Sequence, residues 1–499
     1  MSDGVGKNIF FTSLNGILQS ILTLIFWIVA ATLVDSFVIG FVGAILSFTI
    51  IITTVNSLNI SFGMKGLLGK AFSLGDQNQI RQIFSSLVIF SIISILVSIL
   101  FLSIPPLGIL DFVGFDYEYY WIIILLFSSM SFQFIFSESL VSINRSKDLV
   151  MPMLIASFLR FPILFVMLEI SDPISSIIVS YSSVLFISTI IYGIKLFPYF
   201  KGQINLKNTF KNIKKLILIS FVSWIPQLLS VLGSQLSTLT VFAISGASSG
   251  GKFYIPMMIF SVSLFIVSGI TRVSHPVIAG MDSEQEQSVF LSYTTKIAFL
   301  LTIPLATPLL FFGTDFLGLF GQEFGESGSI LTILMLSFPI GIINEIIYYF
   351  VYGRGDNKSV LYLGIAGTGS RISLYFILVP IFDGNGAAIS FLIGTIIQFI
   401  LTSIISKKHS LNLEYKKYLF LTLIPFIIAF VLWQFEINFV ISTLVIIFSS
   451  LVVYVRINLF TPKDLMNILN SSLPETSAKK YYSILFKIMK KINPSIINM

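Results

Sequence analysis

Long apolar stretches separated by short polar gaps run along the whole 499-residue chain. A helix needs about 20 apolar residues to cross a bilayer, and about fourteen stretches reach that length. Lipid offers no hydrogen-bonding partner to exposed backbone groups, so helices are the expected spanning form. The pattern predicts an all-α polytopic membrane protein with about fourteen transmembrane helices.

The composition agrees with a membrane protein and gives it an orientation. Hydrophobic residues make up 55% of the chain and charged residues only 11%, with a mean hydropathy of +0.95, outside the range of soluble domains. Nearly every Lys and Arg falls in alternate gaps, and acids occupy the others. The positive-inside rule then places both termini in the cytoplasm. We expect a multi-pass protein of a prokaryotic plasma membrane, whose net charge of +7 reflects topology and contact with membrane lipids rather than nucleic acid.

Several chemistries are excluded by the residues present. The chain has no Cys and only two His, which argues against zinc and nucleophile–His sites. The stretch from Gly246 to Lys252 has the spacing of a phosphate-binding loop, but Phe253 stands where a magnesium-binding Ser or Thr is needed. We therefore expect no nucleotide, no metal, no cofactor and no enzymatic activity.

The two halves of the chain resemble each other. The second span (Phe37–Phe62) is followed by a loop reaching Gly75–Asp76, and the eighth by a loop reaching Met281–Asp282. The fourth and tenth spans end in similar turns, Asn144–Lys147 and Gly353–Asp356. Such repeats usually place the substrate site where they meet; coincidence in an Ile-, Phe- and Ser-rich sequence is the alternative. The predicted parts are an N-terminal lobe of helices 1–6 (1–200), a C-terminal lobe of helices 7–12 (201–406), helices 13–14 (407–458) and a cytoplasmic amphipathic tail (459–499).

Two basic amphipathic segments stand outside the spans. Residues 205–216 and 477–493 each combine one apolar face with several lysines. Helices of this kind lie in the membrane interface with the apolar face buried. Both are expected at the inner surface as anchoring helices.

Charges within the spans are costly and usually face a bundle interior or a wet cavity. Glu138 and Arg160 lie on consecutive helices, as do Glu345 and Arg371, so each lobe is expected to hold one internal ion pair. These pairs either hold each lobe together or take part directly in transport. Lys296 lies near the start of its span and is expected to extend its amine to the cytoplasmic surface.

Lys65 and Arg272 follow equivalent spans in the two halves. Two cations facing each other across a cleft can clamp a phosphate or diphosphate, so they are the candidate substrate-binding residues. The alternative is that both are topology-setting bases.

Uncharged polar residues gather on the first, second and seventh spans, where they suit sugar hydroxyls or interhelical hydrogen bonds. The candidate cavity residues are Asn15, Gln19, Asn56, Asn59, Gln227 and Gln235. Thr12 shares a helical face with Asn15 and Gln19. Prolines within spans, among them Pro162, Pro226, Pro304 and Pro339, are expected to bend their helices.

Several segments of the chain resemble those of a known family. The loop from Gly63 to Asp76, the two turns named above, the approach from Phe320 to Ser329 and the run Val379–Ala388 between the eleventh and twelfth spans are similar to patterns of polysaccharide and lipid-linked oligosaccharide flippases (Wzx-like). These belong to the multidrug/oligosaccharidyl-lipid/polysaccharide exporter superfamily. The resemblance covers most of 1–473.

The resemblance implies twelve core helices in two lobes around a V-shaped, MATE-like cavity, with two helices appended. It implies ATP-independent movement of a polyprenyl- or dolichyl-linked glycan from the inner to the outer leaflet by alternating access, in contact with glycan-assembly enzymes. The final helix pair often forms a lipid-side groove in such proteins. Two alternatives stay open: a multidrug/cation antiporter of the same superfamily, and a non-transporting scaffold of a glycan-assembly complex.

Overall fold

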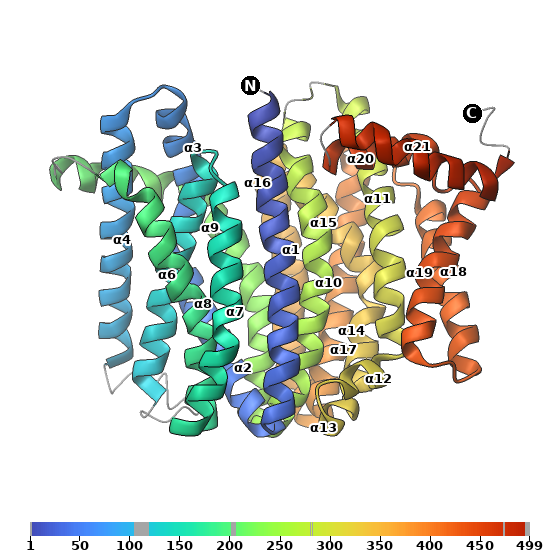
Figure 1. Cartoon of the computed structure of the whole chain (residues 1–499), viewed down its shortest axis with the longest axis horizontal. Helices are drawn as coiled ribbons and strands as arrows, with labels where there is room; N and C mark the ends of the chain where they lie inside the picture. Colours follow the sequence, from blue (N-terminus) through green and yellow to red (C-terminus); the bar gives the residue numbers. More distant parts are fainter. Residues whose placement is uncertain are drawn as a thin grey trace. The chain divides into compact units, whose positions relative to one another are not determined.

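The computed structural model describes residues 2–103, 119–200, 206–279, 281, 283–472 and 475–494, and within these ranges it is helical without strands (Figure 1). By contacts the chain divides into two compact units. Unit 1 comprises Met1–Tyr254 and Arg371–Ala387, and unit 2 comprises Ile255–Ser370 and Ala388–Met499. The predicted six-helix lobes, 1–200 and 201–406, have other boundaries than these contact-based units, and the division into lobes stays a prediction.

Unit 1 contains most of the first half of the chain. Its helices are α1 (Ser2–Leu33), α2 (Ser36–Ser57), α3 (Ile60–Ser73), α4 (Gln77–Ser103), α6 (Tyr120–Ser142), α7 (Lys147–Ile170), α8 (Pro173–Leu196), η3 (Phe197–Phe200), α9 (Leu206–Ser245) and the start of α10 (Ala247–Ala279). It also holds part of α17 (Ser370–Lys408).

Unit 2 contains the rest of α10 and α17 and the following helices. These are α11 (Glu284–Phe311), α12 (Gly313–Gly318), α13 (Gln322–Gly325), α14 (Gly328–Leu336), α15 (Phe338–Gly353), α16 (Asn357–Gly364), the π-helical turn η4 (Ile365–Gly369), α18 (Tyr415–Gln434), α19 (Phe439–Arg456), α20 (Pro462–Ser472) and α21 (Glu475–Ile492).

The number of membrane crossings agrees with the prediction. Among the described residues, 12 helices are long and apolar enough to cross a bilayer, or 13 if the bent pair α14–α15 counts as one span. One of them, Asn357–Lys408, has 52 residues, about 78 Å of helix against a hydrocarbon core of about 30 Å. It is interrupted at Asp383, with φ 51° and ψ −133°. Counted as two crossings, it brings the total to the fourteen expected.

The break at Asp383 depends on the residues that follow it. A Cβ on Gly386 would lie 2.2 Å from the carbonyl oxygen of Leu378, so only glycine permits this approach of the chain to itself. The break falls inside the run Val379–Ala388, at the predicted boundary between the eleventh and twelfth spans.

Only one of the predicted proline bends coincides with a break in a span. The helices α14 and α15 meet at 45°, next to Pro339 in the first turn of α15. The helices α7, α9 and α11 continue through Pro162, Pro226 and Pro304.

A close helix contact explains the glycine-rich stretch before Phe253. A Cβ on Gly251 would lie 2.0 Å from the carbonyl oxygen of Ser36, and one on Gly40 would lie 1.8 Å from that of Ala247. The hydroxyls of Ser36 and Ser248 are 2.8 Å apart. Small residues here let α2 and α10 approach closely, as membrane helices often do.

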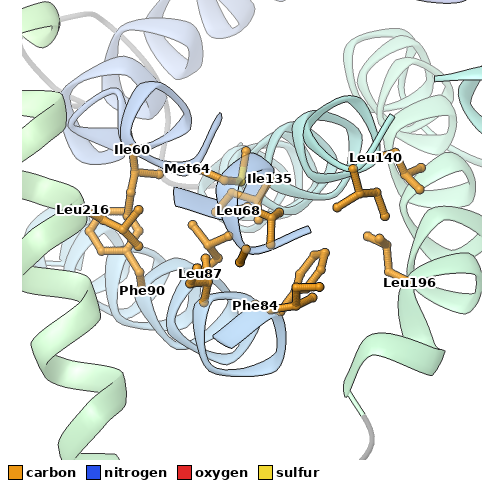
Figure 2. Close-up of a cluster of buried hydrophobic side chains, with 14 of the residues drawn as sticks. Ile60, Met64, Leu68, Phe84, Leu87, Phe90, Ile135, Leu140, Leu196 and Leu216 are labelled. Carbon is orange, nitrogen blue, oxygen red and sulfur yellow. The ribbon is translucent and has the colours of Figure 1, made fainter. Parts of the chain in front are cut away.

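The core of unit 1 beside the charged residues is apolar and tightly packed. Side chains of α3, α4, α6, α8 and α9 form one buried cluster (Figure 2). Met64 and Leu68 of α3 are fully buried in it. Because Lys65 follows Met64 directly, this packing fixes the position of its backbone.

In unit 2, α11 is the central helix and packs against α14, α15, α18 and α19. The last helix, α21, lies across the ends of α18 and α19, and α20 lies beside it, nearer α11 (red in Figure 1). They pack on each other and on the end of α19 through a separate apolar cluster that includes Val455, Leu465 and Met489.

Candidate functional site

Lys65 lies on α3, a helix that a break in the chain separates from α2. Leu58 and Asn59 both have left-handed backbones, with φ 46° and 51°, which ends α2 and redirects the chain. The Asn59 amide donates to the Ser223 hydroxyl at 2.9 Å, and the Gly63 N–H donates to the Ser220 hydroxyl at 3.0 Å. Two hydroxyls of α9 therefore fix α3 beside it.

Lys65 pairs with Glu138 of α6. Its Nζ lies 2.7 Å from Glu138 Oε2, and the two side chains are 52% and 25% exposed. The pair is therefore open to solvent on the lysine side. The carboxylate is more covered, because Glu138 Oε2 is itself buried, so Lys65 is the partner that solvent reaches.

The predicted Glu138–Arg160 pair is wrong, because the two residues lie at different depths. Glu138 is four residues from the end of α6, about 6 Å along the axis, whereas Arg160 is thirteen residues into α7, about 20 Å. Consecutive helices meet at their shared turn, so this difference separates the two side chains.

Arg160 instead joins α7 to α1. It is 2% exposed, its guanidinium lies 4.4 Å from the centroid of the Phe26 ring, and its Nη2 donates to the carbonyl of Leu22. Its Nε has no hydrogen-bond partner. The stacking on Phe26 and the bond to a backbone carbonyl offset part of the cost of burying this charge, and both contacts favour a role in packing.

The two residues of the second predicted pair, Glu345 and Arg371, belong to different units. Glu345 of α15 accepts a hydrogen bond from the Ser268 hydroxyl at 3.0 Å, and its neighbour Asn344 donates to the carbonyl of Thr395 at 3.0 Å. Arg371 lies in the segment of α17 that belongs to unit 1. The Glu345–Arg371 pair stays a prediction.

The phosphate clamp is described only in part. Arg272 lies in α10, but the side chains of 272–279 are outside the described residues. Its opposition to Lys65 stays a prediction.

Two of the predicted cavity residues make interhelical hydrogen bonds. Asn56 donates to the Ser98 hydroxyl of α4, and Asn59 bonds to α9 as described. Asn15 Oδ1 is buried without a hydrogen-bond partner, and the remaining three are partly buried: Gln19, Gln227 and Gln235.

The N-terminal end of α1 is tied to the turn between α6 and α7, a role that the sequence did not indicate. The Asn8 amide donates to the carbonyl of Val141 at 3.0 Å and accepts from the Ser146 N–H at 3.0 Å. Thr12 donates to the Ser146 hydroxyl at 2.8 Å. Thr12 therefore contributes to this contact between α1 and the α6–α7 turn.

The prediction that Lys296 extends its amine to the surface is wrong. Its Nζ lies 2.7 Å from Asp464 Oδ2 of α20, with side chains 15% and 4% exposed. Asp464 also accepts from the Thr461 N–H at 2.8 Å. The lysine therefore anchors α20 to α11.

A cluster of charges follows α6 in unit 1. Asp148 accepts from Arg145 Nε at 2.6 Å and from Lys195 Nζ at 2.8 Å. These three residues, the unit 1 turn cluster, join the α6–α7 turn to the end of α8. Asp148 is 12% exposed and balances two cations.

A second cluster lies at the equivalent turn of unit 2. Arg354 donates to Glu284 at 2.8 Å and lies 3.0 Å from His409 Nδ1, while His409 Nε2 lies 3.1 Å from Asp356. We call these four residues the unit 2 turn cluster. Because Arg354 can only donate, Nδ1 accepts its hydrogen bond, and the Nε2–H group donates to Asp356; this arrangement corresponds to a neutral imidazole.

The Asp356 carboxyl also caps α16. It accepts from the Ser359 N–H at 3.1 Å and from the Ser359 hydroxyl at 2.6 Å. The hydroxyl bond lowers the pKa of Asp356 below its usual value; burial acts in the opposite direction, and the hydrogen bond from His409 adds to the decrease.

Comparison with solved structures identifies the fold. The chain is similar to the lipid II flippase MurJ in an inward closed conformation, with TM-score 0.68 and 17% identity over 91% of this chain and 98% of that one. It is also similar to an inward-facing multidrug resistance MATE transporter of the MOP superfamily, with TM-score 0.65 and 16% identity over 79% of this chain and 94% of that one. A MOP superfamily transporter from Pyrococcus furiosus aligns with TM-score 0.55 and 13% identity over 81% of this chain and 96% of that one.

No family model matches the sequence, and no curated protein matches it either. Identities of this size show the fold alone. The solved relatives are transporters and a flippase rather than enzymes. The chain is a multi-pass membrane protein with the fold shared by MATE transporters and MurJ.

Proposed function

We propose that this protein moves a lipid-linked oligosaccharide or polysaccharide precursor from the inner to the outer leaflet by alternating access, without ATP. The observation that carries the proposal is the exposed Lys65, whose side chain is 52% exposed while its Nζ lies 2.7 Å from the Glu138 carboxylate. A diphosphate can bind such a cation from its solvent side through charge-assisted hydrogen bonds.

The similarity to MurJ supports a lipid-linked substrate. The alignment with MurJ covers 91% of the chain, against 79% for the MATE transporter. MurJ is a flippase of lipid II, and a lipid-linked glycan diphosphate matches the clamp that Lys65 and Arg272 are proposed to form.

The membrane potential would assist outward movement. An inside-negative potential favours export of an anion by about 2.3 kcal/mol per charge per 100 mV if the charge crosses the whole field. ATP is therefore unnecessary for direction.

The test is translocation of a fluorescent polyprenyl-diphosphate glycan by the reconstituted full-length protein. Lys65→Gln should slow translocation by about tenfold or more, the loss of one charge-assisted hydrogen bond. Lys70→Gln, which removes an exposed cation five residues along the same helix, should leave the rate unchanged. Glu138→Gln should tighten binding of the glycan diphosphate, since it removes the competing carboxylate.

Unchanged translocation by Lys65→Gln would refute the role of this lysine. A protein that exchanges cationic dyes for cations and moves no glycan would instead be an antiporter. The acid available for coupling in unit 2 is then Glu345, which lies on a predicted span and bonds to Ser268.

A further inference from the structure

The C-terminal helix α21 is fixed at the end of a membrane-spanning helix. The Asn493 amide donates to the carbonyls of Val455 and Arg456 at 3.0 and 3.2 Å, in the last turn of α19. Arg456 in turn donates to the carbonyl of Ile492 at 3.0 Å. These bonds hold the end of α21 at the end of α19, a helix long and apolar enough to cross a bilayer.

The neighbouring helix α20 is fixed just as firmly. Its Asp464 is 4% exposed and pairs with Lys296 of α11, and Leu465 is buried beside Val455 and Met489. The α20–α21 pair is therefore attached to two spans, α11 and α19.

One stripe of α21 faces the protein. Ala478, Met489 and Asn493 are 0%, 4% and 6% exposed, and Tyr482 and Phe486 pack in the same cluster. Residues along a helix turn by about 100° each, and this stripe spans less than a quarter of the circumference.

A second apolar stripe of α21 is left partly exposed by the described residues. Tyr481, Ile484 and Ile488 are each 50% exposed and Leu485 is 38% exposed. Their spacing of three, four and seven residues places them on one face. A contiguous exposed apolar stripe marks a contact surface.

Lysines occupy the remaining face. Lys480, Lys487 and Lys491 are exposed and lie beside the apolar stripe on the side away from the protein, with Lys490 one step further round. The charge of this face is complementary to acidic lipid headgroups, and its apolar neighbour is complementary to the acyl boundary.

We propose that α21 is a lipid-binding helix: its stripe Tyr481, Ile484, Leu485 and Ile488 inserts at the membrane surface, and Lys480, Lys487 and Lys491 bind acidic phospholipid headgroups. The position of α21 at the end of α19 puts the stripe at the depth of the headgroups. This proposal does not depend on which substrate the protein transports.

A cysteine probe can test the insertion, because the chain has no native Cys. Ile484→Cys places a fluorophore in the exposed apolar stripe, and Ser483→Cys places it about 100° round the helix, on the lysine side. The full-length protein is reconstituted in phosphatidylcholine vesicles with or without phosphatidylglycerol, and quenching by a lipid-borne quencher is measured. The probe at 484 should be quenched more strongly than the probe at 483. Equal quenching at both sites would overturn the insertion and leave the stripe to a protein partner.

A charge variant tests the choice of acidic lipid. Lys480→Gln, Lys487→Gln and Lys491→Gln together should reduce the preference of full-length protein for phosphatidylglycerol over phosphatidylcholine by about tenfold or more, as measured by lipid retention. The matched control, Lys480→Arg, Lys487→Arg and Lys491→Arg together, keeps the three positive charges and should keep the preference. If the Gln variant keeps the full preference, or if 484 is quenched equally without phosphatidylglycerol, recognition of acidic lipid is overturned.

Discussion

The two turn clusters share a backbone but differ in chemistry. Each follows a span that ends with a left-handed residue, Asn144 in unit 1 (φ 57°) and Gly355 in unit 2 (φ 73°). In each, the next N–H bonds back to a carbonyl five residues earlier, Arg145 to Leu140 at 2.8 Å and Asp356 to Val351 at 3.1 Å. This is the Schellman ending of a helix.

The residue after the left-handed position is a base in unit 1 and an acid in unit 2. Arg145 binds the acid three residues later, whereas Asp356 caps the next helix through Ser359. Unit 1 surrounds its acid with two permanent cations, and unit 2 uses a neutral His409 between Asp356 and Arg354. The acid at the turn is therefore held by two close permanent cations in unit 1 and mainly by hydrogen bonds from Ser359 and His409 in unit 2, and the two arrangements should differ in energy.

The largest effect is expected from Asp148→Asn. This change removes the charge that balances Arg145 and Lys195 at a position 12% exposed, and it should lower the free energy of unfolding by about 2 kcal/mol. Thermal unfolding of the purified protein in detergent measures it. Asp35→Asn is the control, because Asp35 is exposed and caps α2 through Val38, a role that Asn fills equally well. Equal losses of stability in Asp148→Asn and Asp35→Asn would show that the ion pairs of Asp148 do not stabilise unit 1.

Asp356→Asn should have a smaller effect, about 1 kcal/mol. Asn keeps the cap to the Ser359 N–H, and the nearest cation, Lys408, lies 3.9 Å away and is 67% exposed. The same unfolding assay compares the two variants. A loss as large as that of Asp148→Asn would contradict the distinction between the clusters.

The spans were predictable because hydropathy is local and repeats along the chain, and so was the break near Asp383, where Gly and Asn follow. The break between α2 and α3 was not. The predicted span Phe37–Phe62 continued through Leu58 and Asn59, and nothing in an apolar run indicates that Leu will adopt a left-handed backbone.

The partners of the charges were less predictable than their presence in the spans. Glu138 and Arg160 could have been separated by depth alone, since a helix rises about 1.5 Å per residue. The partner of Lys296 is 168 residues away, at Asp464, and no local pattern reports such a contact. The repeated turns in the sequence indicated where the two clusters lie. Their charges were not predictable from this repeat, because matching positions carry different residue types, a base at 145 and an acid at 356.

Acid should weaken unit 2 through Asp356. The folded-state pKa of this carboxyl is lowered, so its stabilising contribution is full above the unfolded pKa of about 3.9 and is lost as pH falls through the folded value. The difference between the native protein and Asp356→Asn should therefore be constant near neutral pH and shrink below about pH 4. Melting temperatures of both proteins across this range measure it; a difference that grows on acidification would have the wrong sign.

The smallest effect, a decrease of about 0.5 kcal/mol in the free energy of unfolding, should come from replacing His409 with a permanent cation. In His409→Lys the new ammonium can pair with Asp356, but it meets Arg354, which contacts His409 Nδ1 at 3.0 Å, and like charges repel. Arg354→Gln removes this repulsion, so the double variant should be more stable than the sum of the two single changes predicts. Additive losses in the unfolding assay would show that Arg354 and residue 409 act independently. The neutral charge of His409 would then not explain why Arg354 is tolerated near Asp356.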